Sequence, residues 1–69
     1  MNALDLFKKD MWIARDKDGQ LYAYDKRPIR QELYGFFIAG VANGKIIEIF
    51  SGFYQEITWL NSPVKVNDI

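Results

Sequence analysis

Two apolar segments, residues 36–42 and 45–50, are separated by only Asn43 and Gly44. An Asn-Gly pair between two β-type segments is a strong signal for a hairpin, because both residues tolerate the positive φ angles of a type I′ turn. The pattern therefore predicts that these two segments pair with each other. It constrains the fold more than any other feature of the chain.

This turn also fixes which residues face each other across the expected hairpin. Phe37 is expected opposite Phe50, and Glu48 is expected beside Ala39 on an otherwise apolar face. Burial there would raise the pKa of Glu48, although a charge that discourages aggregation is the plainer explanation. Both faces are largely apolar, so they either form core or bind a partner. The candidate partner-binding residues are Phe37, Val41, Ile46, Phe50 and Phe53.

A second hairpin is predicted from residues 11–15 and 20–25, which are rich in aromatic and β-branched residues. The segment between them, residues 16–19, ends in Gly19 and has the composition of a turn. With a four-residue loop, Arg15 lies opposite Gln20. The expected core face then consists of Trp12, Ala14, Leu21 and Ala23.

The remaining segments are short and are separated by turn residues. Residues 28–35 suit either one helical turn or a connecting loop, because Pro28 cannot donate to a strand ladder. Residues 51–55 predict a tight turn or a 3₁₀ segment. Two further short strands are expected, at residues 56–59, with Ile57 and Trp59 facing inward, and at residues 64–66 on a sheet edge.

The whole chain reads as one small, mainly β domain. It has 69 residues, equal numbers of acidic and basic side chains, and neither His nor Cys. Zinc sites built on Cys or His, Ser-His triads and disulfides are therefore excluded. We expect four to five antiparallel strands in two hairpins that form a twisted sheet or a partly open barrel, with at most a short helical segment. Residues 1–10 are expected as a flexible tail or short helix, and residues 11–69 as the domain.

A basic cluster near two tyrosines gives an alternative function. Cations beside exposed aromatic rings are how small β domains hold single-stranded nucleic acid. The candidate residues for such binding are Tyr22, Tyr24, Lys26, Arg27 and Arg30. Against this stand the zero net charge and a plainer explanation, a solvated loop beside half-buried tyrosines. The two tryptophans are expected as core anchors.

Other kinds of site have little support. Asp16 and Asp18 alternate as in a calcium loop, but the positions that an EF-hand gives to Gly and to a bidentate acid hold Leu21 and Arg27. We expect no metal, no cofactor, no small-molecule substrate and no enzyme activity. The chain has no transmembrane-length apolar segment, and we expect a cytoplasmic protein that does not bind membranes.

Two motifs resemble those of short, uncharacterised bacterial and prophage proteins. They are WIARDKDGQLY at residues 12–22 and EITWLNSPV at residues 56–64, and the resemblance covers roughly residues 12–66. The very apolar residues 36–39 depart from the usual polar central strand. The resemblance implies a free-standing small β domain, often carried on mobile elements, and it carries no known activity that could be assigned to residues of this chain.

Together these observations predict a non-enzymatic interaction domain. It would bind another protein, or a second copy of itself as a homodimer, through an apolar and aromatic sheet face or by strand addition at a sheet edge. The alternative is a nucleic-acid-binding accessory protein that uses the basic, tyrosine-rich edge.

Overall fold

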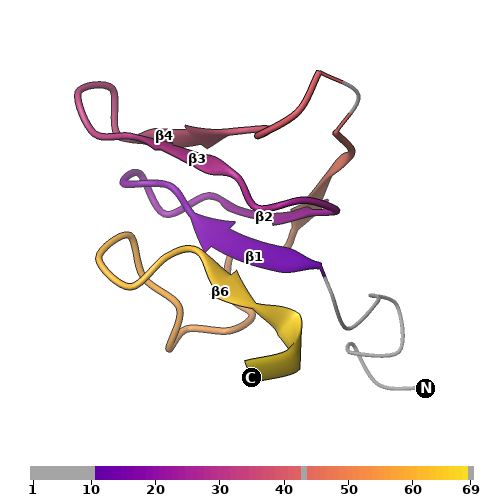
Figure 1. Ribbon diagram of the computed structural model, residues 1–69. Coiled ribbons are helices and arrows are strands. Elements are labelled where there is room, and N and C mark those ends of the chain that lie inside the picture. Colours follow the sequence, from indigo (N-terminus) through magenta and orange to yellow (C-terminus); the bar gives the residue numbers. More distant parts are fainter. Residues whose placement is uncertain (1–10, 43, 69) are drawn as a thin grey trace.

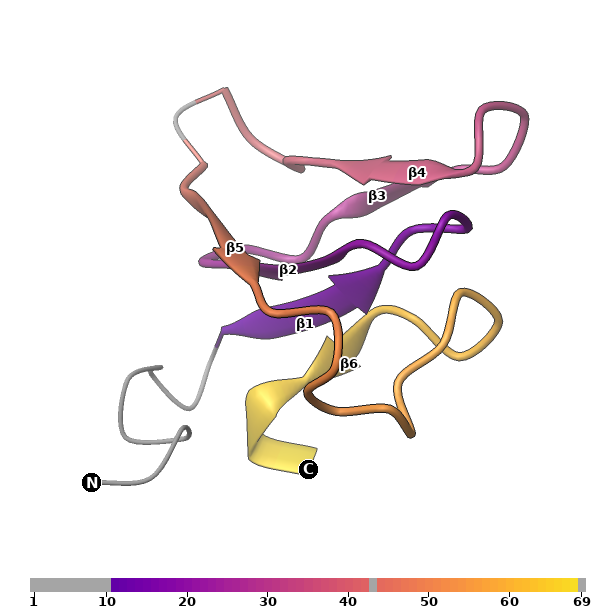
Figure 2. The same ribbon diagram turned by 180° about the vertical axis from the view of Figure 1, so that it is seen from behind.

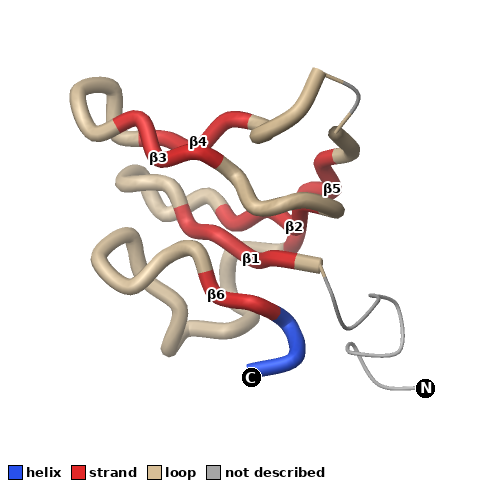
Figure 3. Tube along the Cα trace, in the orientation of Figure 1, coloured by secondary structure: helices blue, strands red, loops and turns tan. Residues whose placement is uncertain are grey.

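The computed structural model describes residues 11–42 and 44–68, which form two antiparallel β-sheets (Figures 1 and 3). The larger sheet has the strand order β5-β2-β1-β6. Its strands are β1 (Trp12–Arg15), β2 (Leu21–Tyr24), β5 (Ile46–Ile49) and β6 (Val64–Lys65). The smaller sheet pairs β3 (Ile29–Gln31) with β4 (Phe36–Ile38), and a 3₁₀ turn, η2 (Val66–Asp68), follows β6. The mainly β fold is as predicted, with six strands in place of four or five. The expectations for residues 1–10 lie outside the described residues.

The larger sheet is covered on both faces. Figures 1 and 2 show the β3–β4 hairpin over one face and the loop that leads from β5 to β6 along the other. Under β3–β4, a core cluster contains Ala14, Tyr24 and Phe37. The cluster on the opposite face contains Met11, Ile13, Leu21, Ala23, Ile49, Ile57 and Val66. Two separate apolar clusters explain why β1 and β2 carry apolar residues at almost every position.

The β1–β2 hairpin forms as predicted, but its register differs by one residue. Arg15 lies opposite Leu21, and Trp12 lies opposite Tyr24. The Asp16 N–H donates to the Gln20 carbonyl at 2.8 Å, and Gly19 has φ of +99°. The loop therefore has three residues closed by the Asp16–Gln20 pair, with Gly19 in the left-handed position typical of such loops. The predicted assignment of side chains to the two faces of the sheet was therefore wrong. Trp12 and Ala14 lie on the same face as the tyrosines of β2, and not on the face of Leu21 and Ala23.

The hairpin predicted around Asn43-Gly44 was wrong. β4 pairs with β3, and β5 pairs with β2, so residues 39–45 connect two sheets. Two contacts hold β4 over the first hairpin: the Phe37 N–H donates to Asp16 Oδ1, and the Lys17 N–H donates to the Gly35 carbonyl, both at 2.9 Å. Pairing and packing with distant parts of the chain therefore outweigh the local turn preference.

Two other segments also differ from expectation. The helical turn predicted for residues 28–35 is limited to its second half, because residues 29–31 form β3. The Gly35 N–H donates to the Gln31 carbonyl at 2.9 Å, which closes one turn that ends at Gly35, with φ of +77°. Residues 56–59 are not a strand. The side chain of Asn61 accepts from the Thr58 N–H at 2.7 Å and donates to the Glu56 carbonyl at 2.8 Å, so these backbone groups are satisfied locally. The buried position of Ile57, the turn at 51–52 and the edge position of β6 are as predicted.

Arg15 joins the two motifs that the sequence singles out. Its guanidinium donates to the carbonyls of Gly19, Ser51, Phe53, Tyr54 and Ile57 at 2.6–3.1 Å. Its backbone N–H donates to Ser62 Oγ at 2.9 Å, and Ser62 Oγ donates to the Thr58 carbonyl. Residues 12–22 and 56–64 thus form one hydrogen-bonded unit.

Among the described residues, no helix is long and apolar enough to cross a membrane.

Candidate interaction surfaces

The first candidate surface lies along β5, at one edge of the larger sheet. Within the described residues, β2 is the one strand that pairs with β5. Ile49 points into the core, whereas Ile46 and Ile47 are half exposed and Phe50 is 71% exposed. The Phe50 ring meets Phe53 edge-on, with 5.4 Å between ring centroids. Ile46 and Ile47 lie on opposite faces of the sheet, because successive strand residues alternate. We call Ile46, Ile47, Phe50 and Phe53, which flank this edge on both faces, the β5 surface.

Three of the predicted partner-binding residues, Ile46, Phe50 and Phe53, belong to this surface. Val41 is exposed as well, but it lies in the connection between β4 and β5. Phe37 was wrongly placed on the surface, because it is 5% exposed and its ring meets Trp59 edge-on at 5.3 Å. The cause is the hairpin that does not form: Phe37 pairs with Arg30 on β3 rather than with Phe50.

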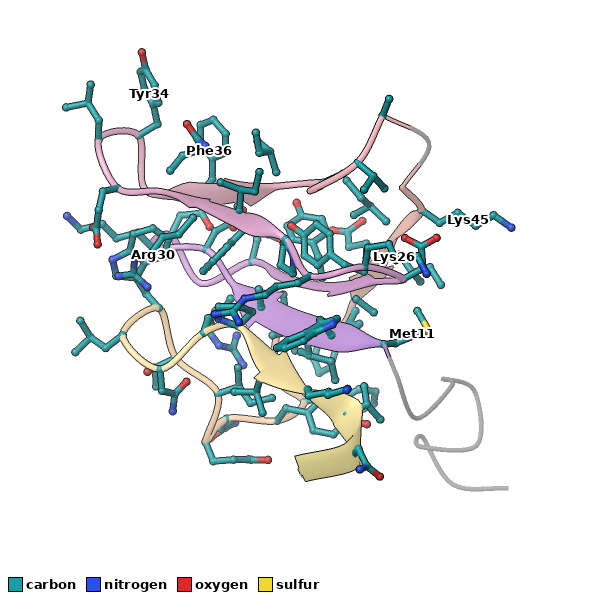
Figure 4. The ribbon with its side chains drawn as sticks, viewed as in Figure 1. Met11, Lys26, Arg30, Tyr34, Phe36 and Lys45 are labelled. Atoms are coloured by element: carbon teal, nitrogen blue, oxygen red, sulfur yellow. The ribbon has the colours of Figure 1, made fainter. Side chains whose placement is uncertain are left out.

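A second apolar surface was not predicted. It is the outer face of the β3–β4 hairpin, where Ile29, Phe36 and Ile38 are 39–49% exposed. The Tyr34 ring stacks on Phe36 with 5.8 Å between centroids. Figure 4 shows Tyr34 and Phe36 pointing away from the larger sheet. Ile29, Arg30 and Gln31 do not alternate between apolar and polar side chains, so the sequence carries no strand signal there, and Pro28 suggested a break.

The predicted nucleic-acid site is divided by the structure. Tyr24 is 2% exposed, and its hydroxyl donates to the Phe37 carbonyl at 3.4 Å. Burial raises its pKa to about 12, with a smaller contribution from Asp16. Tyr22 packs against the same core cluster. Figure 4 shows Lys26 and Arg30 at opposite ends of the molecule, so the predicted residues do not form one surface.

The structure instead gathers three cations around the two tryptophans. Arg30 Cζ lies 3.8 Å from the ring centroid of Trp59, and Arg27 Cζ lies 5.1 Å from that of Trp12. Lys65 Nζ is 5.8 Å from the Trp12 centroid. Both rings are half-buried at the margin of the core cluster under β3–β4. We call these five residues the tryptophan face.

Sequence reasoning missed this arrangement because its members come from distant segments. Only Arg27 and Arg30 are near each other in the chain, and both were included in the predicted basic cluster. Lys65 meets Trp12 because β6 pairs with β1, which places these two residues opposite each other. No local pattern predicts that pairing.

The structure does not support the burial considered for Glu48. Its side chain is exposed, and its neighbour on β2 is Tyr22 rather than Ala39. The Asp18 carboxylate accepts a hydrogen bond from the Gln20 N–H at 3.0 Å, which is a turn contact. In the part of the chain that the structure describes, no three acidic side chains are grouped so that they would hold a metal ion.

Comparison of the chain with protein-family models, with curated proteins and with solved structures found no match.

Proposed function

We propose that this domain binds another protein by accepting an extended segment as an additional strand beside β5. The observation that supports this proposal is the combination of exposed apolar side chains with a strand edge along which no other described strand lies. In strand addition, backbone hydrogen bonds supply affinity, and the side chains beside the edge supply specificity.

The hydrogen-bonding groups of β5 alternate in direction. The Asp25 N–H donates to the Lys45 carbonyl at 3.3 Å, so these residues form a hydrogen-bonded pair. In an antiparallel ladder such pairs alternate, and the register therefore makes Ala23–Ile47 and Leu21–Ile49 the next ones. The backbone N–H and C=O groups of Ile46 and Glu48 therefore point away from β2, toward the side of β5 on which no other described strand lies.

The side chains beside this edge are unusual for an exposed strand. Natural edge strands are commonly protected by charge, proline or a bulge. β5 has one charged residue, Glu48, among three isoleucines, and Phe50 follows directly. A segment paired with β5 would cover apolar side chains of the β5 surface.

The proposal is tested with a proline at position 48. Glu48→Pro removes an outward N–H and leaves the ladder with β2 intact, because proline is tolerated where the N–H faces solvent. Glu48→Ala is the matched control, because it removes the same side chain and keeps the N–H. Peptides selected from a random-sequence library against the 69-residue chain serve as ligands.

We expect Glu48→Ala to retain peptide affinity within about threefold and Glu48→Pro to lose at least about tenfold, or about 1.4 kcal/mol. Hydrogen exchange of the Ile46 and Glu48 amides should slow in the complex. Equal affinity of the two variants, with both folded by circular dichroism, would contradict strand addition. Sedimentation of the free protein shows whether a second copy of the chain occupies the edge. If it does, Glu48→Pro should be a monomer and Glu48→Ala should remain a dimer.

A further inference from the structure

The tryptophan face is a second surface with a different chemistry from the β5 surface. Both tryptophans of the chain belong to it. Trp12 and Lys65 are cross-strand neighbours on β1 and β6, so their side chains share one face of the sheet. Arg30 reaches the same side of the molecule from β3, and its Nη1 donates to the Trp59 carbonyl at 2.6 Å. Figure 4 shows Arg30 between β3 and the loop that precedes β6.

Most of the positive charge on this face is not neutralised by the described part of the chain. The ion pair between Arg30 Nε and Glu32 Oε1, at 2.8 Å, is the only one among the described side chains of residues 11–42 and 44–67. Arg27 and Lys65 are therefore left to interact with the Trp12 ring at distances of 5–6 Å. Cations at such distances from a half-exposed ring keep their N–H donors accessible to an anion.

Three aspartates of the first half of the domain are used away from this face. Asp16 accepts from the Phe37 N–H, Asp18 from the Gln20 N–H and Asp25 from the Lys45 N–H, each at 2.9–3.0 Å. These carboxylates hold turns and connections rather than the cations of the tryptophan face. The chain as a whole has zero net charge, but these carboxylates lie apart from the cations of the tryptophan face.

We propose that the tryptophan face binds single-stranded nucleic acid. Half-exposed indole rings offer stacking surface to bases of any sequence, and interleaved arginine and lysine side chains contact the backbone phosphates. When a base stacks on Trp12, Arg27 and Lys65 move from the ring to the phosphates on either side of that base. Arg30, held against Trp59, presents its remaining N–H donors to the next phosphate. This site is independent of strand addition at β5.

The two tryptophans make the test direct, because intrinsic fluorescence and the two indole N–H signals in an NMR spectrum both report on this face. The 69-residue chain is titrated with an oligothymidylate of about 12 nucleotides. We expect quenching of fluorescence and shifts of both indole signals. With three phosphate contacts, the logarithm of the association constant should fall with the logarithm of salt concentration with a slope of about −2.

Arg27→Ala/Lys65→Ala is the test variant, and Lys17→Ala/Lys45→Ala is the control with the same loss of charge. We expect the test variant to lose about tenfold or more in affinity at low salt and its salt slope to become shallower, changing from about −2 to about −0.7, because two of the three phosphate contacts are gone. The control should change affinity by less than about threefold. If the test variant does not fold, Arg27→Glu alone should abolish quenching.

Three results would overturn the proposal: no quenching or indole shift at low salt, equal losses in the test and control variants, or equally tight binding of a poly-glutamate peptide. The last result would show a site for acidic protein segments without base stacking. Retention of oligonucleotide binding by Glu48→Pro separates this site from the β5 surface.

Discussion

Arg15 is the residue on which the loop between β5 and β6 most depends. Its guanidinium donates to five backbone carbonyls, four of which belong to residues 51–57. The planar fork of arginine suits such a set of acceptors, whereas the ammonium group of lysine has three donors and no fixed plane. The loop covers one face of the larger sheet, so the contacts of Arg15 also protect the core beneath it.

We predict that Arg15→Lys lowers the free energy of unfolding by about 2–3 kcal/mol, because several part-buried carbonyls lose their partner. Urea denaturation measures the change. The control is Arg27→Lys, an exposed substitution of the same kind, with an expected loss below about 1 kcal/mol. Similar losses in the two variants would show that Arg15 contributes through its charge alone.

The second residue with a specific consequence is Tyr24. Its buried hydroxyl has a pKa raised to about 12, whereas the unfolded chain has the ordinary tyrosine value near 10. A raised pKa of an acid means that the folded state disfavours the ionised form. Its contribution to stability is therefore complete below about pH 10 and is lost as the pH rises toward 12.

We predict that alkaline destabilisation between about pH 10 and 12 is weaker in Tyr24→Phe than in the unsubstituted protein, by on the order of 2 kcal/mol. Denaturation series at several pH values measure this difference. Burial also raises the pKa of Tyr54, so part of the pH dependence should remain in the variant. A pH dependence that is unchanged by Tyr24→Phe would contradict this assignment.

Among the elements, the β1–β2 hairpin shows how far local pattern carries. The presence of two strands and a turn was predictable, because β-branched and aromatic residues flank a segment rich in Asp and Gly. The register was not predictable, because it depends on whether Asp16 and Gln20 pair. A three-residue loop and a four-residue loop both suit the same residues. A register that differs by one residue places every side chain of β2 on the face opposite to the predicted one, relative to β1.

The connection from β4 to β5 shows the opposite case, in which a strong local signal was misleading. Asn43-Gly44 has the composition of a hairpin turn, but the preceding Gly40 lies against the first half of the chain. A Cβ atom built on Gly40 would be 2.3 Å from the carbonyl oxygen of Arg27. The absence of a side chain therefore allows residues 39–45 to leave β4 toward β5.

We predict that Gly40→Ala destabilises the domain by about 2 kcal/mol or more, because two backbone segments must separate. Gly35→Ala is the comparison. It introduces strain at a φ of +77°, but the nearest atom to its new Cβ is the Lys17 side-chain Cβ at 3.1 Å. We expect a smaller loss of about 1 kcal/mol there. Thermal denaturation should reproduce this order, and the reverse order would show that the conformation at Gly35 matters more.

At the scale of the whole molecule, the sequence predicted the fold class and some residues of two of the three candidate surfaces, the β5 surface and the tryptophan face. Ile46, Phe50 and Phe53 were identified because they are apolar residues in excess of what one core needs. Phe37 was included wrongly and the β3–β4 outer face was missed, because both depend on which strands pair. The tryptophan face depends on the pairing of β6 with β1, which joins residues far apart in the chain.

The position of β6 also has a consequence for how the chain acquires its structure. β1 is an inner strand whose second neighbour is β6, about fifty residues later in the chain. During synthesis on the ribosome, β1 remains an edge until residues 64 and 65 have emerged, although β2 is already available. Contacts between such distant segments slow folding. A nascent chain of this protein therefore passes through a period in which the edge of β1 is unpaired and open to chaperones or to other nascent chains.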